Sequence, residues 1–121
     1  IAKRIATAKM AKLVTVACAA DVAEATVIAK TAQPDYIAVE PPELIGGNVS
    51  VSKAKPEVVS DSVAAVKSAN RSIKVLCGAG VNSREDVEKA LELGTEGILV
   101  ASSVVLAKDP EKALLELISG I

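Results

Sequence analysis

The sequence predicts an α/β fold in which short parallel strands alternate with helices, in the manner of a β/α barrel. Four apolar runs of about five residues are each followed by a segment whose apolar residues recur at helical spacing. The runs are rich in Val, Ile and Leu and lack polar alternation, which is typical of strands buried on both faces of a parallel sheet. No shift in composition divides the chain, so we expect residues 1–121 to form a single unit.

The N-terminal part is expected to contain a partial helix, a strand and a complete helix. Within residues 1–8 the apolar positions lie on one helical face, but no N-cap residue precedes them. We therefore expect the chain to be a fragment that starts inside a helix. Residues 13–17 (LVTVA) then predict a buried strand. Asp21 is a suitable N-cap for a helix that runs to about Thr31.

The second predicted strand, residues 36–40, delivers a carboxylate to its C-terminal end. Glu40 is followed at once by Pro41 and Pro42, which end the strand and fix the direction in which the loop leaves. This loop, residues 41–54, contains two adjacent glycines that suit a hinge. A β/α-barrel enzyme presents a general base under a lid in this way. Taken alone, Glu-Pro-Pro is more often an ordinary solvated turn.

The C-terminal half continues the order of strand, loop and helix. Capping residues and an N1 proline mark where its helices begin. The expected elements are a helix from 56 to about 68, a strand at 73–77, a helix capped by Ser83 and Asp86, a strand at 97–101 and a helix capped by Asp109.

Composition and charge exclude several classes of function. The formal net charge is −1 with no long basic run, so a nucleic-acid-binding surface has no electrostatic basis. No apolar run approaches the length of a membrane span and no signal-peptide pattern opens the chain, so a cytoplasmic protein is expected. Cys18 and Cys77 form no disulfide framework and are expected to be small buried thiols. The chain has no histidine, so it supplies no histidine acid or metal ligand.

Three strand ends are expected to meet at one edge of the sheet. They carry Glu40 with Gly46 and Gly47, the glycine turn at 78–80, and the small residues at 101–103. In a β/α barrel these loops share one rim, where phosphate sites commonly form from the loops after the last two strands. Glycine lets the backbone approach a phosphate closely, and free N–H groups supply donors to its oxygens. The sequence therefore predicts a phosphate-binding edge that carries one acid.

Five stretches of the chain closely resemble archaeal-type triosephosphate isomerases. They are 38–46 (AVEPPELIG), 51–58 (VSKAKPEV), 74–80 (KVLCGAG), 92–97 (ELGTEG) and 108–113 (KDPEKA). The resemblance covers nearly all of this chain but only the C-terminal half of that family's TIM (β/α)8 barrel, from the helix before strand five to the helix after strand eight. We therefore expect the chain to form about half of a TIM barrel.

The resemblance implies interconversion of dihydroxyacetone phosphate and D-glyceraldehyde 3-phosphate, with no metal or organic cofactor. Glu40 matches the family's catalytic base, which moves a proton between neighbouring carbons through an enediolate. Residues 41–48 match the family's lid. The positions that hold the substrate, mainly through backbone N–H groups around its phosphate, are matched by Ile45, Gly80, Ala101 and Ser102.

The chain departs from the family's pattern in three ways. The lid usually ends Gly-Thr-Gly, whereas residues 46–48 are Gly-Gly-Asn, which adds roughly 0.5–1 kcal/mol of ordering cost on closure. Ser103 replaces the glycine of an Ala-Ser-Gly turn and would be strained if that position needs a positive φ. The electrophilic histidine and the substrate-binding Asn and Lys come from the family's other half. Losing such a donor lowers the rate by about 10²–10³.

Four strands cannot close a barrel that takes about 250 residues. Open edges at 13–17 and 97–101 and an apolar inner face would remain, which favours association with the N-terminal half of a barrel or with a second copy of this chain. The resemblance implies a homodimer or homotetramer. The alternatives are a phosphate-binding half-barrel module that self-associates without chemistry and a purely structural oligomerisation piece. Another phosphate-dependent barrel enzyme, such as a lyase or synthase of the tryptophan or histidine pathways, is a further alternative, against which the Glu-Pro-Pro lid argues.

Overall fold

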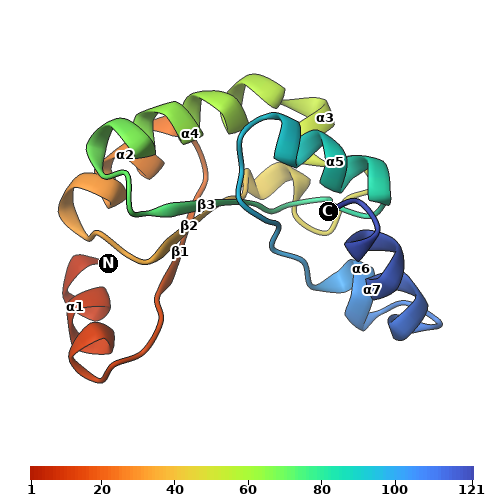
Figure 1. Cartoon of the computed structure of the whole chain (residues 1–121), viewed down its shortest axis with the longest axis horizontal. Helices are drawn as coiled ribbons and strands as arrows, with labels where there is room; N and C mark the ends of the chain where they lie inside the picture. The colour runs from red at the N-terminus through yellow and green to blue at the C-terminus, as the bar shows by residue number, and fades with distance from the viewer.

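A parallel sheet covered by helices on one face forms the centre of the molecule (Figure 1). The computed structural model describes residues 1–121. The strands are β1 (Val16–Ala19), β2 (Tyr36–Val39) and β3 (Lys74–Cys77), in the order β1-β2-β3. Their register aligns Val16 with Tyr36 and Tyr36 with Lys74. The predicted α/β fold with parallel strands, covering part of a β/α barrel, is confirmed.

The first strand begins three residues later than predicted. Leu13 and Val14 are exposed, and Lys12, which follows the C-cap of the preceding helix, has a left-handed φ of 59°. The backbone N–H of Thr15 donates to the carboxylate of Asp35 (2.8 Å) and not to a neighbouring strand. The predicted start of this strand at residue 13 is therefore wrong. The Asp35 side chain, from the turn before β2, occupies the Thr15 N–H that a longer strand would use for pairing.

A fourth strand does not form, so the prediction of a strand at 97–101 is wrong. The segment runs alongside β3 only briefly: Cys77 N donates to the Gly97 carbonyl (3.0 Å) and Leu99 N donates to the Cys77 carbonyl (2.9 Å). A single bridge between Cys77 and Ile98 results. Beyond Leu99 the chain turns at Ala101 (φ −137°, ψ −80°) and leaves the sheet.

The helices begin where the capping residues predict. Asp21 accepts from Glu24 N, Ser83 and Asp86 form a reciprocal capping box, and Asp109 accepts from Lys112 N. The long loop after β2 also contains short helices that the sequence did not suggest. The helices are α1 (Ala2–Met10), α2 (Val22–Thr31), the 3-10 helix η1 (Pro42–Leu44), α3 (Val51–Ala54), α4 (Pro56–Ala69), α5 (Arg84–Glu92), α6 (Ser102–Val105) and α7 (Pro110–Ile118).

The core lies between one face of the sheet and helices α2, α4 and α5 (Figure 1). Alternate strand residues on that face, among them Ile37 and Val75, are fully buried. The opposite face has no helix over it, so Val16 is 49% exposed and Cys18 is also exposed. Cys77 is buried as expected, whereas the expectation of a buried Cys18 is wrong because its β1 position faces the uncovered side. None of the helices combines the length and apolar character needed to cross a membrane.

Thr15 and Asp35 join the start of β1 to the start of β2 through reciprocal hydrogen bonds. The Asp35 carboxylate accepts from Thr15 N (2.8 Å) and Thr15 Oγ1 (2.7 Å), while Asp35 N donates to Thr15 Oγ1 (3.0 Å). The hydrogen bonds from the Thr15 side chain and backbone hold the pKa of Asp35 below its usual value. Its carboxylate therefore stabilises the fold above the ordinary Asp pKa of about 3.9, and this contribution is lost as the pH falls through the lower folded value.

We expect Asp35→Asn to lower the thermal unfolding midpoint at pH 7 and to lose less stability than the unsubstituted chain between about pH 5 and pH 2. Thermal unfolding by circular dichroism at several pH values measures this difference. Asp61→Asn, on the exposed side of α4, serves as the control and should keep the acid sensitivity of the native chain. Equal acid sensitivity in Asp35→Asn and the native chain would contradict the assignment.

Candidate functional site

A hollow of about 60 Å³ lies at the C-terminal edge of the strands. One water needs about 10–15 Å³ by this measure, so the hollow has room for a small anion. Segments that follow β2 and β3, together with the segment that leads into α6, line it. All five residues that the sequence singled out lie on its wall: Glu40, Ile45, Gly80, Ala101 and Ser102.

The backbone of Glu40 continues the direction of β2. Its N–H donates to the Ala19 carbonyl of β1 (2.8 Å), and the buried Pro41 follows it. The side chain crosses toward the turn after β3, where it lies directly over Gly78. A Cβ on Gly78 would lie 2.8 Å from Glu40 Cδ and closer still to Cγ, so only glycine leaves room for the carboxylate there. The acid therefore faces the glycine turn and not the outer solvent.

Cys18 is a site neighbour that the sequence reasoning missed. It lies on the uncovered face of β1, in register with Ala38 of β2, beside the Glu40 carboxylate. Partial burial of the thiol, its hydrogen bond with Glu40 and the charge of that carboxylate raise the pKa of Cys18 to about 11. The cysteine is thus held as a neutral thiol against the acid. The signal in the sequence was the position of Cys18 one residue before the end of β1, opposite Ala38, which lies two residues before Glu40.

The turn at 78–82 has a constrained backbone. Ala79 and Gly80 both have positive φ (64° and 72°), a conformation that is costly for alanine and free for glycine. Gly80 is pressed against the Val49 carbonyl, which a Cβ would overlap. Val51 N donates to the Ala79 carbonyl (3.1 Å), so the end of the long loop is attached to this turn.

Backbone donors in the hollow are free. The N–H groups of Gly80, Ala101 and Ser102 make no hydrogen bond within the chain. The N–H of Ile45, by contrast, donates to the Pro42 carbonyl (3.3 Å) and is already used in this conformation of the loop. No Lys or Arg lines the hollow, so an anion there would be held by backbone amides.

The loop over the hollow uses one glycine for its turn. Gly46 has a φ of 71° with open space around it, whereas Gly47 and Asn48 keep negative φ. An ion pair between Glu43 and Lys55 joins the loop to the segment that follows it. Of the three residues Gly46, Gly47 and Asn48, therefore, only Gly46 adopts the left-handed backbone conformation.

The strain considered for Ser103 does not arise, because the residue has negative φ at the start of α6. Its Oγ is buried without a hydrogen-bond partner, as is that of Ser62 in α4. Glu40 is the single ionisable residue among those that line the hollow. No group of three or more His, Cys, Asp or Glu residues is arranged to bind a metal ion. One carboxylate beside free backbone donors can transfer a proton on a bound anionic molecule.

Comparison with known families gives a match that extends over the whole chain. The model of the family described as triosephosphate isomerase matches residues 1–121. The triosephosphate isomerase of Methanothermus fervidus is 57% identical over 107 residues, which are 88% of this chain and 48% of that protein. The triosephosphate isomerase of Methanocaldococcus jannaschii is 62% identical over 88 residues, which are 73% of this chain and 40% of that protein. The chain thus spans about half the length of these relatives.

Solved structures with the same arrangement of elements are more distant in sequence. A thiamine phosphate pyrophosphorylase from Pyrococcus furiosus superposes with a TM-score of 0.72 at 25% identity, over 96% of this chain and 52% of the other. A mandelate oxidase mutant superposes with a TM-score of 0.67 at 26% identity, over 96% of this chain and 37% of the other. In both cases this chain again corresponds to only part of a larger structure.

Gly80→Ala is expected to destabilise the fold more than Gly46→Ala. Both residues have positive φ, which costs alanine about 1–2 kcal/mol, but only at Gly80 does the new Cβ overlap a neighbouring backbone carbonyl. Overpacking of this kind adds about 1–3 kcal/mol. Urea denaturation of the two variants measures the difference, with Gly46→Ala as the control for the conformational cost. Equal losses would show that the Val49 contact yields without cost.

The Cys18 thiol is expected to react slowly with iodoacetamide at pH 8 and several-fold faster in Glu40→Gln. Removal of the neighbouring carboxylate lowers the pKa of the thiol toward its ordinary value, and the thiolate is the reactive form. Mass spectrometry of the alkylated chain measures both rates, and the buried Cys77 is the internal control. An unchanged rate at Cys18 would place Glu40 away from it.

Proposed function

The chain belongs to the triosephosphate isomerase family, and from this premise we propose that it supplies the base and the phosphate-binding edge of a triosephosphate isomerase. The observation that carries the proposal is the meeting of Glu40 with three free backbone N–H groups in one hollow. The reaction is the interconversion of dihydroxyacetone phosphate and D-glyceraldehyde 3-phosphate. The triose phosphate is the expected substrate, and we propose that no organic cofactor or metal takes part.

Glu40 acts as the base in this proposal. Its carboxylate takes a proton from the carbon next to the substrate carbonyl, which leaves an enediolate, and the same proton-bearing group returns a proton to the neighbouring carbon. The position of the Glu40 side chain against Gly78 supports this role, because Glu40 lines the hollow there.

The phosphate is held by the N–H groups of Gly80, Ala101 and Ser102. These groups have no partner within the chain, and an unpaired N–H that becomes enclosed is costly unless an anion or water accepts from it. Ile45 contributes from the lid segment, defined here as residues 41–48. Its N–H becomes available to the substrate only when the bond to Pro42 opens, so we propose that the lid changes conformation as it closes.

The remaining groups of the active site come from outside these residues. The chain has no histidine, and no lysine lines the hollow, so stabilisation of the enediolate requires another segment. We propose that residues 1–121 act as one unit and that the N-terminal half of a barrel, or a second copy of this chain, covers the open face of the sheet. A homodimer or homotetramer of the completed barrel is the proposed assembly.

The second candidate is a phosphate-binding half-barrel that self-associates without chemistry. The uncovered sheet face favours it, because exposed apolar surface such as Val16 promotes association. The two candidates differ in one measurable property. The isomerase requires the Glu40 carboxylate for turnover, whereas the binding module needs only the backbone donors.

The test uses a chimera in which this chain replaces the matching segment of the Methanothermus fervidus relative. We expect isomerase activity from the chimera and a loss of about 10³ in kcat for Glu40→Gln, because general-base catalysis contributes 10²–10⁴-fold. Glu40→Asp should lose about 10–10²-fold, since a base displaced by one methylene is poorly placed. A coupled assay of triose phosphate turnover measures both variants.

Glu57→Gln, in the first turn of α4 and away from the hollow, is the matched control and should keep full activity. Phosphate binding that persists in a chimera without isomerase activity would favour the binding module. Unchanged turnover in both Glu40 variants would remove this residue from the mechanism.

A further inference from the structure

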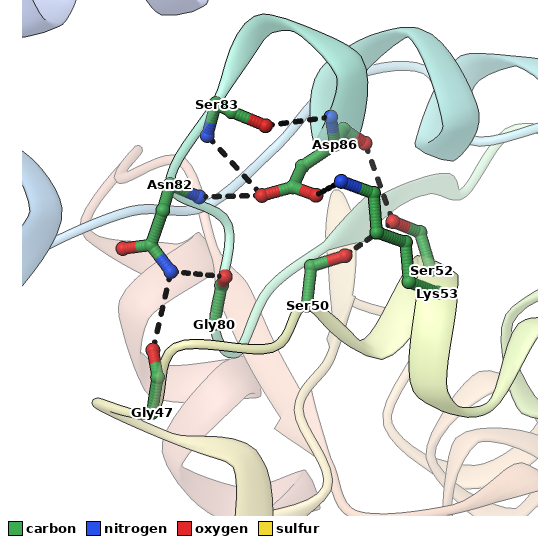
Figure 2. A network of polar contacts seen from close by, with 8 residues as sticks. All are labelled: Gly47, Ser50, Ser52, Lys53, Gly80, Asn82, Ser83 and Asp86. Carbon is green, nitrogen blue, oxygen red and sulfur yellow. Dashed lines mark hydrogen bonds and ion pairs between the residues drawn. The ribbon is translucent and has the colours of Figure 1, made fainter.

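A buried carboxylate outside the hollow joins the lid to the turn that carries the phosphate donors. Asp86, in the first turn of α5, is 4% exposed. Its carboxylate accepts from Lys53 Nζ (2.7 Å), from Asn82 N (2.9 Å) and from Ser83 N (3.2 Å), as Figure 2 shows. One side chain thus contacts α3, which follows the lid, and the end of the 78–82 turn.

The side chains of Ser52 and Asn82 also join these segments, as Figure 2 shows. Ser52 Oγ donates to the Asp86 carbonyl (3.3 Å) and lies 2.5 Å from Ser50 Oγ. On the other side of the turn, Asn82 Nδ2 donates to the Gly80 carbonyl (2.6 Å) and to the Gly47 carbonyl of the lid (3.2 Å). The lid's C-terminal end is therefore bonded to Asn82 at the end of the turn, and α3, which follows the lid, is bonded to the start of α5.

Helix capping accounts for only part of this arrangement. In a capping box the acidic side chain accepts from the N–H of the N-cap residue, here Ser83. Asp86 also accepts from the preceding residue, Asn82, and pairs with Lys53 from a different helix. Burial alone would raise the pKa of Asp86, but the bonds from Lys53, Asn82 and Ser83 outweigh it and hold the pKa below its usual value. The group is therefore a buried, fully bonded anion.

We propose that Asp86 is a positioning residue that, through Lys53 and Asn82, fixes the 78–82 turn against the lid's C-terminal end so that the Gly80 N–H points at the substrate phosphate. The proposal rests on the proposed function. The direction of an N–H group depends on the backbone on both sides of it. Before Gly80 the turn is held by the hydrogen bond from Val51 N to the Ala79 carbonyl. After Gly80 it is held by Asp86, which accepts from Asn82 N and Ser83 N. Asp86 does not line the hollow, so its effect in this proposal is on binding geometry.

The test compares variants of the chimera with two measurements. Lys53→Met removes the ion pair and leaves the helix cap intact, and Asp86→Asn removes the charge. Titration calorimetry with inorganic phosphate and steady-state kinetics form the first measurement. Amide hydrogen exchange at Val51, whose N–H donates to the Ala79 carbonyl, forms the second and reports whether the lid's end stays on the turn.

We expect each variant to weaken phosphate binding and to raise KM by about tenfold, with kcat within about twofold of the parent, because the lost interaction acts on binding. Exchange at Val51 should accelerate by at least about tenfold. The double variant should lose no more than Asp86→Asn alone, as for two residues that act through one contact. Glu88→Gln, which breaks the exposed pair between Arg84 and Glu88 on the same helix, is the control and should change neither measurement.

Native phosphate affinity and native Val51 exchange in Lys53→Met would overturn the proposal and leave Asp86 as a helix cap alone. If Asp86→Asn fails to fold, Lys53→Met still decides, because Lys53 is half exposed and outside the cap. Absence of phosphate binding and turnover in the unsubstituted chimera would overturn the proposed function. The exchange measurement would then still show whether Asp86 and Lys53 hold the lid's end to the turn.

Discussion

The structure depends on the parallel pairing of β2 with both of its neighbours. Because the strands run in the same direction and in register, the residues after them emerge at one edge. Glu40 N donates to Ala19 of β1, and Gly78 N donates to Val39 of β2, so the acid is fixed between two backbones before its side chain makes any contact. The absence of a side chain at Gly78 then determines where the carboxylate can lie. The positions of Glu40, of the 41–48 loop and of the glycine turn after β3 are consequences of this ladder.

Sequence reasoning succeeded where the signals were local. The cap at Asp21, the box of Ser83 with Asp86 and the proline-terminated strand before Glu40 are each specified within a few residues, and each is present. It failed where a distant partner decides the outcome. The Asp35 carboxylate accepts a hydrogen bond from Thr15 N, so β1 begins later than predicted. Residues 97–101 pair with β3 at a single bridge and form no strand. The propensity of a short apolar run carries no information about these partners.

The same distinction applies to the site. Glu40 was located by a local signal, the end of the predicted strand before it, and it lines the hollow. The other four predicted residues came from the resemblance to a known family and not from periodicity, and they line the same hollow: Ile45, Gly80, Ala101 and Ser102. The contact of Cys18 with Glu40 and the ion pair of Lys53 with Asp86 join residues far apart in the chain, and no spacing rule reveals them. The sequence also does not reveal that the N–H groups of Gly80 and Ala101 are free, because this depends on the hydrogen-bond partners of all the other backbone groups around them.

The core is built almost wholly from aliphatic side chains, and Tyr36 is the one aromatic residue. It stands at the start of β2, at the end of the strand away from Glu40, with the Lys74 ammonium 5.6 Å from the centre of its ring. Ultraviolet absorbance and intrinsic fluorescence therefore report on this far edge alone, and movement over the hollow is optically silent. The fluorescence of a tryptophan introduced into the 41–48 loop would therefore be measured with almost no contribution from other residues, because the chain has no Trp and one Tyr.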